Sequence, residues 1–185
     1  RALRAGPRGP RTLPGRVYDT GSADLSRYGY GIKGFMLSMV QTAIELTDGR
    51  IEGRQIARIL DLGAEMLAHP VTLLPGVEQA LDALEGRRLI LITKGDLMDQ
   101  ERKIAASGLA ERFAAVQILA DKTPEAYARV LMGQGVEPSR FLMAGNSMRS
   151  DVIPVLDLRG TGVFIPHDLT WSHEHAEAPD HPRLH

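Results

Sequence analysis

The chain has 185 residues, 43% of them hydrophobic and 24% charged, which suits one α/β domain with a small attached lobe. The net charge of −1 and the lack of any apolar run near the roughly 20 residues of a membrane span argue against nucleic acid and membranes as partners. Cysteine is absent, which excludes disulfides, thiolate nucleophiles and Cys-ligated zinc and is compatible with a reducing cytoplasm, the expected location.

The first segment, residues 1–27, is an irregular basic leader. Arginines alternate with glycine and proline there, and no helical or strand period is present. This composition is typical of a segment without regular structure, and the alternative is an anion-binding arm. Asp19-Thr20-Gly21-Ser22 is similar to the active-site loop of aspartic proteases, but those enzymes need two such aspartates and are almost all β.

The second segment, residues 28–72, is predicted to be a small helical lobe. Apolar residues recur at helical spacing up to Leu46, and Gly49 ends the run. A second helix is predicted over 53–68, and Pro70 stops it. No strand pattern interrupts these two helices.

The third segment, residues 73–168, alternates short apolar runs with amphipathic helices. Continuous apolar runs of four residues suit strands that are buried on both faces of a parallel sheet. Strand–helix alternation with short links predicts an α/β fold with a doubly wound, Rossmann-like parallel sheet. The predicted strands are 89–92, 116–119, 141–144 and 162–165, and the predicted helices are 75–84, 97–107, 124–134 and a last one that ends at Leu158.

The last segment, residues 169–185, is a polar tail. His173 and His175 lie two positions apart, which on a helix would place them on different faces. A solvated tail and a metal site are both compatible with this spacing.

Polar residues follow three successive strands of the predicted sheet. Thr93 and Lys94 follow the first, Lys122 follows the second, and Asn146 and Asp151 follow the third. Ligands of an open parallel sheet bind outside the carboxyl ends of its strands. A hydroxyl and backbone amides can hold phosphate oxygens, lysines can neutralise them, and a carboxylate beside an amide oxygen can ligate Mg²⁺. Each residue alone has an ordinary structural explanation, such as a helix cap, but their shared placement indicates a site.

This ordered set of motifs resembles the haloacid dehalogenase (HAD) superfamily of hydrolases. The strand ending in Thr93 is similar to the second motif of that family, and Lys122 near the start of a helix is similar to the third. The sequence Gly-Asn-Ser-Met-Arg-Ser-Asp over 145–151 is similar to the fourth. The resemblance covers about residues 28–172, and it implies that the helical lobe is a cap and that the α/β segment is the HAD-like core.

The resemblance also implies a role for each residue. Thr93 and Lys122 would be catalytic, and both would bind the substrate together with the backbone amide of Lys94. Asp151 and Asn146 would hold Mg²⁺. The attack would come from an aspartate in an Asp-x-Asp motif on the first strand, through an aspartyl-phosphate intermediate.

Two departures from the family pattern change these expectations. Asn146 stands where an aspartate is usual, so Mg²⁺ should bind more weakly. No Asp-x-Asp occurs in residues 1–27, so we expect that the first strand is missing through truncation or frame shift and that the chain as given is inactive. Asp19 is the alternative nucleophile, without the usual acid/base aspartate two residues later.

The predicted function is that of a Mg²⁺-dependent phosphatase of a small phosphorylated metabolite. A haloacid dehalogenase-type hydrolase is the alternative among enzymes, because family dehalogenases use a similar core. A catalytically dead α/β module that binds phosphate is the alternative outside enzymes. The sequence leaves the identity of the substrate and the oligomeric state open.

Overall fold

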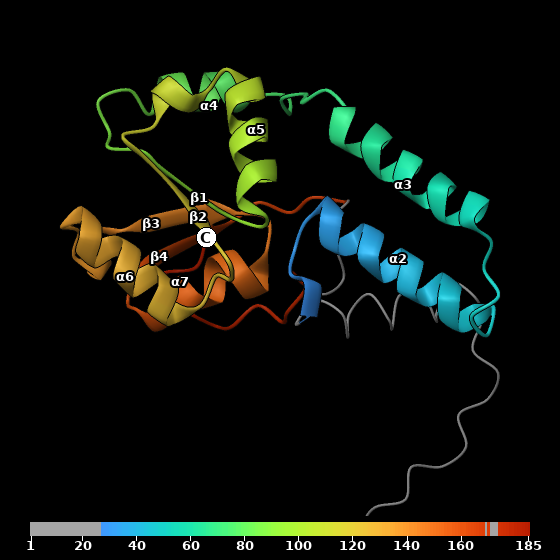
Figure 1. Ribbon diagram of the computed structural model, residues 1–185. Coiled ribbons are helices and arrows are strands. Elements are labelled where there is room, and N and C mark those ends of the chain that lie inside the picture. The colour runs from blue at the N-terminus through green and yellow to red at the C-terminus, as the bar shows by residue number, and fades with distance from the viewer. Residues whose placement is uncertain (1–26, 169, 171–173) are drawn as a thin grey trace, which may run out of the picture. The chain divides into compact units, whose positions relative to one another are not determined.

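The structure is a computed structural model that describes residues 27–168, 170 and 174–185 (Figure 1). The predicted leader, with Asp19 and the protease-like loop, lies outside the described residues except for its last position, and so does His173 of the tail. The chain divides after Pro70 into two compact units, each described by itself below. No helix in the described ranges combines the length and the apolar character that crossing a bilayer requires.

In the described part of the first unit, the helices α2 (Ile32–Leu46) and α3 (Gly53–Ala68) lie where helical periodicity predicts them. The two helices contact each other. Gly63 of α3 is buried, and a β-carbon at this position would collide with the thioether of Met36. The missing side chain therefore lets the two helices approach closely at this point.

The second unit is an α/β fold with two pairs of parallel strands. β1 (Ile90–Lys94) pairs with β2 (Ala115–Leu119), and β3 (Leu142–Gly145) pairs with β4 (Thr161–Phe164). Each strand begins and ends within two residues of its predicted bounds. The strands are less buried than the expected burial on both faces, because several of their side chains are only partly covered or are exposed. The helices are α4 (Val77–Ala83), α5 (Leu97–Ser107), α6 (Pro124–Gln134) and α7 (Ile153–Asp157), with α4 and α5 on one side of the strands and α6 and α7 on the other in Figure 1.

The parallel sheet of this α/β unit is small. Among the described residues, β1 and β3 are not hydrogen-bonded to each other, and the strands form two separate two-stranded sheets. Packing joins them instead: Ile92 of β1 and Met143 of β3 belong to one buried cluster with Tyr127, which is fully buried. The two strand pairs therefore share a hydrophobic core, although no backbone hydrogen bonds between strands join them.

The end of the tail is not simply solvated. Leu184 forms a parallel bridge with Gly162 of β4, and the His185 amide donates to the Gly162 carbonyl at 2.9 Å. The Phe164 amide in turn donates to the carbonyl of His185 at 2.8 Å. The physical reason is that an edge strand presents amides and carbonyls that need partners, and the tail supplies them.

The helix that the sequence predicts up to Leu158 is interrupted by a π-helical turn over Met148–Val152, after which α7 begins. Pro154 has no backbone N–H, so the Ser150 carbonyl cannot receive the usual bond from the residue four positions later. The hydroxyl of Tyr127 donates to that carbonyl instead, at 3.0 Å. The irregular turn therefore depends on a side chain of α6 as well as on its own sequence.

Candidate active site

A lysine–carboxylate pair lies at the carboxyl ends of the strands. Lys122 Nζ lies 2.6 Å from Asp151 Oδ1, and the two side chains are only 11% and 6% exposed. Lys122 follows β2 and directly precedes Thr123, which caps α6 by accepting a hydrogen bond from the Ala126 amide at 3.2 Å. The π-helical turn carries Asp151, whose Oδ2 accepts from the Ser147 amide at 3.0 Å. Lys122 and Asp151, which follow different strands, therefore form a direct ion pair.

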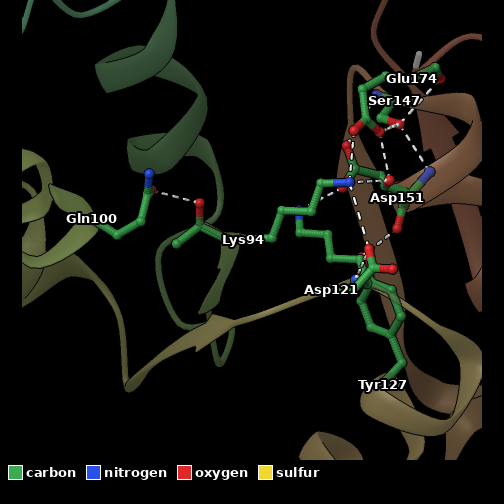
Figure 2. Close-up of polar contacts among 10 residues, drawn as sticks. Lys94, Gln100, Asp121, Tyr127, Ser147, Asp151 and Glu174 are labelled. Atoms are coloured by element: carbon green, nitrogen blue, oxygen red, sulfur yellow. Dashed lines mark hydrogen bonds and ion pairs between the residues drawn. The ribbon is translucent and has the colours of Figure 1, made fainter. Parts of the chain in front are cut away.

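A second lysine–carboxylate pair lies beside the first. Lys94 ends β1, and its Nζ lies 2.6 Å from Glu174 Oε1 and 2.8 Å from the Ser150 hydroxyl. Asp121 Oδ1 is farther away, at 3.7 Å. In the ladder, Lys94 is opposite Leu119, the last residue of β2, and this register places the two lysines at one edge of the sheet. Figure 2 shows the side chain of Lys94 reaching toward Glu174 and Asp151.

Glu174 accepts hydrogen bonds with both carboxylate oxygens. Its Oε2 accepts from the hydroxyls of Ser147, at 2.6 Å, and Ser150, at 2.5 Å. Burial raises the pKa of this carboxyl, but hydrogen bonds from Lys94, Ser147 and Ser150, together with the charge of Lys94, outweigh it and lower the pKa to about 2. Glu174 is therefore an ionised carboxylate at neutral pH.

Sequence reasoning missed Glu174 as a member of the site and assigned Lys94 to it chiefly through the backbone amide. Glu174 belongs to the polar tail, where neither periodicity nor a recognised motif distinguishes it from its neighbours. Lys94 was expected to contribute its backbone amide, whereas its side chain makes the contacts described above. Only the adjacency of Thr93 and Lys94 to a predicted strand end could have indicated that the amine lies here.

The side chain of Tyr127 lies against the π-helical turn that carries Asp151. Its hydroxyl is buried and donates to the Ser150 carbonyl, so it stays protonated. Burial, and to a lesser extent the negative charges of Asp151 and Glu174, raise the pKa of this phenol well above its usual value. Tyr127 is thus a hydrogen-bond donor and not a base.

Thr93 is oriented differently from Lys94. Its hydroxyl donates to Gln100 Oε1 of α5 at 2.8 Å. Successive residues of a strand point to opposite faces, which separates the Thr93 hydroxyl from the amine of Lys94. Figure 2 shows Gln100 on the side opposite the cluster around Asp151. The structure therefore brings Lys94, Lys122 and Asp151 together and gives the Thr93 hydroxyl a separate partner.

Asn146 lies next to the cluster and contacts the tail. Its amide nitrogen donates to Thr170 Oγ1 at 2.8 Å. His175 Nε2 lies 3.2 Å from the carbonyl of the same Thr170. In the part of the chain that the structure describes, no three His, Cys, Asp or Glu side chains form a group that could hold a metal ion. The oxygens of Asp151 and Asn146 are nevertheless of the hard type that Mg²⁺ prefers.

The arrangement of two lysines beside carboxylates is suited to binding an anion next to a metal cation. The two ammonium groups can donate to anionic oxygens, whereas the hydroxyls of Ser147 and Ser150 donate to Glu174. The neighbouring carboxylates keep the local charge near balance. The donors come from three different strand ends, the position in which open parallel sheets bind ligands. A separate pocket of about 440 Å³ between α5 and β2 contains none of these residues.

The chain is similar to one family model and to several solved structures. The family model described as haloacid dehalogenase-like hydrolase matches residues 5–154. A haloacid dehalogenase-like family hydrolase from Xanthomonas campestris is 43% identical, with a TM-score of 0.81, over 91% of this chain and 68% of its own. No curated protein matches the chain.

Two more distant structures share the fold. L-2-haloacid dehalogenase from Xanthobacter autotrophicus, solved with chloropropionic acid covalently bound, is 18% identical, with a TM-score of 0.58, over 81% of this chain and 61% of its own. A HAD phosphatase from Thermococcus onnurineus is 20% identical, with a TM-score of 0.51, over 88% of this chain and 81% of its own. The chain thus spans about two thirds of the length of the first two structures.

Proposed function

We propose that this chain, which belongs to the haloacid dehalogenase-like hydrolases, forms part of a Mg²⁺-dependent phosphatase. The substrate would be a small phosphorylated metabolite in the cytoplasm. The observation that carries the proposal is the buried pair of Lys122 and Asp151, with the amine of Lys94 beside it. A phosphate monoester presents several anionic oxygens, and the two ammonium groups at one sheet edge can each donate to one of them.

The residues of this chain have distinct tasks in the proposed reaction. Lys122 and Lys94 donate to phosphate oxygens and stabilise the charge that builds up on them. Asp151 holds the ammonium group of Lys122 in place. The carboxylate of Asp151 and the amide oxygen of Asn146 would hold Mg²⁺, which when bound neutralises phosphate charge.

A 2-haloacid is the second candidate substrate. The Xanthobacter enzyme with the same fold is solved with chloropropionic acid covalently bound, and its haloacid carries a single carboxylate. One lysine would suffice to bind such a monoanion. The number of lysines that contribute to binding therefore distinguishes the two substrates.

Calorimetric titration with inorganic phosphate and Mg²⁺ tests the proposal without requiring turnover. We expect saturable binding that weakens roughly tenfold in Lys122→Ala, because one charge-assisted hydrogen bond is lost. Lys103→Ala is the matched control, since Lys103 is an exposed lysine of α5. Tighter binding of 2-chloropropionate than of phosphate would favour the dehalogenase, and no binding of either anion would contradict both functions.

Hydrolysis of p-nitrophenyl phosphate distinguishes an enzyme from a phosphate-binding module. The sequence contains no Asp-x-Asp in residues 1–27, so we expect no turnover above background by this chain, even with Mg²⁺. Turnover that is lost in Lys122→Ala would show that a nucleophile is present after all. Binding of phosphate without turnover would leave the binding module as the function of this chain.

A further inference from the structure

The two sheets are connected at their carboxyl ends by side chains. Lys94 at the end of β1 contacts Ser150 in the turn after β3, and Glu174 contacts both. We infer that Glu174 is a positioning residue, which holds the amine of Lys94 beside the pair of Lys122 and Asp151. This inference rests on the proposed function, because the amine is held where it can receive a phosphate oxygen.

The first argument concerns the mobility of a lysine. A lysine side chain has four rotatable bonds, so holding its amine in one place costs considerable rotamer entropy. The amine of Lys94 is nevertheless fixed, and its side chain is only 13% exposed. The neutral hydroxyl of Ser150 is a weaker partner than the carboxylate of Glu174, which forms a charge-assisted bond. The carboxylate of Asp121 lies farther from the amine, at 3.7 Å, so Glu174 is the closer of these two carboxylate partners.

The second argument concerns the direction of the serine hydroxyls. Ser150 has one O–H, and because it donates this hydrogen to Glu174, its lone pairs are left to accept from Lys94. The Ser147 hydroxyl likewise donates to Glu174 and accepts from the Ser150 amide, at 2.8 Å. One carboxylate thus determines the orientation of three donor groups.

The third argument is the parallel with Asp151. Asp151 pairs with Lys122 and is anchored by the Ser147 amide, whereas Glu174 pairs with Lys94 and is anchored by the Ser147 hydroxyl. Both lysines are thus held by carboxylates that are fixed to the same turn. Glu174 belongs to neither cluster of buried apolar residues, so its contacts are polar and converge on the site.

The test is selective labelling of lysines with an amine-specific acylating reagent, quantified by mass spectrometry for Lys94 and Lys122 in one sample. We expect Glu174→Gln to increase labelling of Lys94 roughly tenfold, since one charge-assisted bond is lost, and to leave Lys122 unchanged. Glu174→Asp, which keeps the charge, should restore part of the protection. Glu177→Gln is the matched control, because Glu177 is an exposed glutamate of the same tail.

Unchanged labelling of Lys94 in Glu174→Gln would overturn the inference, and so would an equal rise for Lys122, which would indicate general loosening. If Glu174→Gln does not fold, Lys94→Gln removes the ion pair between Lys94 and Glu174 by replacing the lysine instead. Labelling of Lys122 in that variant must then remain at the wild-type level, and a rise would count against the inference.

Phosphate titration separates this inference from the proposed function. If Lys94 responds as expected while neither the wild type nor Glu174→Gln binds phosphate, the phosphatase proposal fails and the positioning of Lys94 stands. If the wild type binds phosphate, its affinity should fall roughly tenfold in Glu174→Gln. Unchanged affinity despite release of Lys94 would overturn the positioning role.

Discussion

Gly145 lies directly against the carboxylate of Asp151: a β-carbon at position 145 would meet Asp151 Oδ2 at 2.2 Å. This distance is far below van der Waals contact, so a side chain at position 145 would displace the carboxylate from Lys122. The glycine at the end of β3 is therefore required by the site and not by its backbone conformation.

Gly145→Ala should accordingly destabilise the fold by about 1–3 kcal/mol, the usual cost of overpacking a buried position. It should also weaken phosphate binding, because the pair of Lys122 and Asp151 is disrupted. Urea unfolding and calorimetry measure the two effects. Gly133→Ala is the control: it lies in α6 with no atom near its added carbon, and it should stabilise the helix by about 0.5–1 kcal/mol.

The second prediction concerns the acid stability that Glu174 provides. Its pKa is lowered from 4.5 to about 2 in the folded protein, so its ionised form stabilises the fold fully above the unfolded value. As the pH falls through about 4.5 toward 2, that contribution is lost progressively. The difference in unfolding free energy between wild type and Glu174→Gln should therefore shrink between about pH 5 and about pH 3.

Urea unfolding of both proteins across this range is the measurement. Glu177→Gln, at an exposed position of the same tail, corrects for the general loss of carboxylate charge. A difference between wild type and Glu174→Gln that stays constant down to pH 3 would mean that the carboxylate has no stabilising partners in solution.

The third prediction concerns the hydrogen bond between Tyr127 and the Ser150 carbonyl. Tyr127→Phe leaves this buried carbonyl without its donor, which should cost about 1–3 kcal/mol in unfolding free energy. Pro154→Ala restores an N–H four residues after Ser150 and should reduce that cost in the double variant. Equal costs in both backgrounds would show that an N–H at position 154 does not replace the Tyr127 hydroxyl as donor to the Ser150 carbonyl.

The fourth prediction concerns Asn146, which stands where the family pattern has an aspartate. It is proposed to hold Mg²⁺ together with Asp151. Asn146→Asp adds a negative charge at that point, so Mg²⁺ affinity should rise roughly tenfold. Isothermal titration with Mg²⁺ measures the change. Asp151→Asn should abolish binding, whereas Asp157→Asn, at an exposed position of α7, should leave it unchanged. Equal affinity in wild type and Asn146→Asp would remove Asn146 from the metal site.

The sequence by itself determined the order and type of the elements in the α/β unit. Short, mostly apolar runs followed by a glycine or a polar residue indicated the strands through local preferences alone. Pro124 and Thr123 specify the start of α6 in the same local way. The pair of Lys122 and Asp151 was also predictable, because parallel strands place their carboxyl ends at one edge whatever the details of packing.

Only the tertiary structure decided which side chains complete the site. Glu174 reaches Lys94 because the chain returns to the sheet after β4, and no local preference encodes a contact between positions 80 residues apart. The direction of Thr93 follows from the register of β1, and the Ser150 carbonyl in the π-helical turn accepts from Tyr127 of another helix. Such contacts depend on how whole elements pack, and a pattern along the chain records only the preferences of each element by itself.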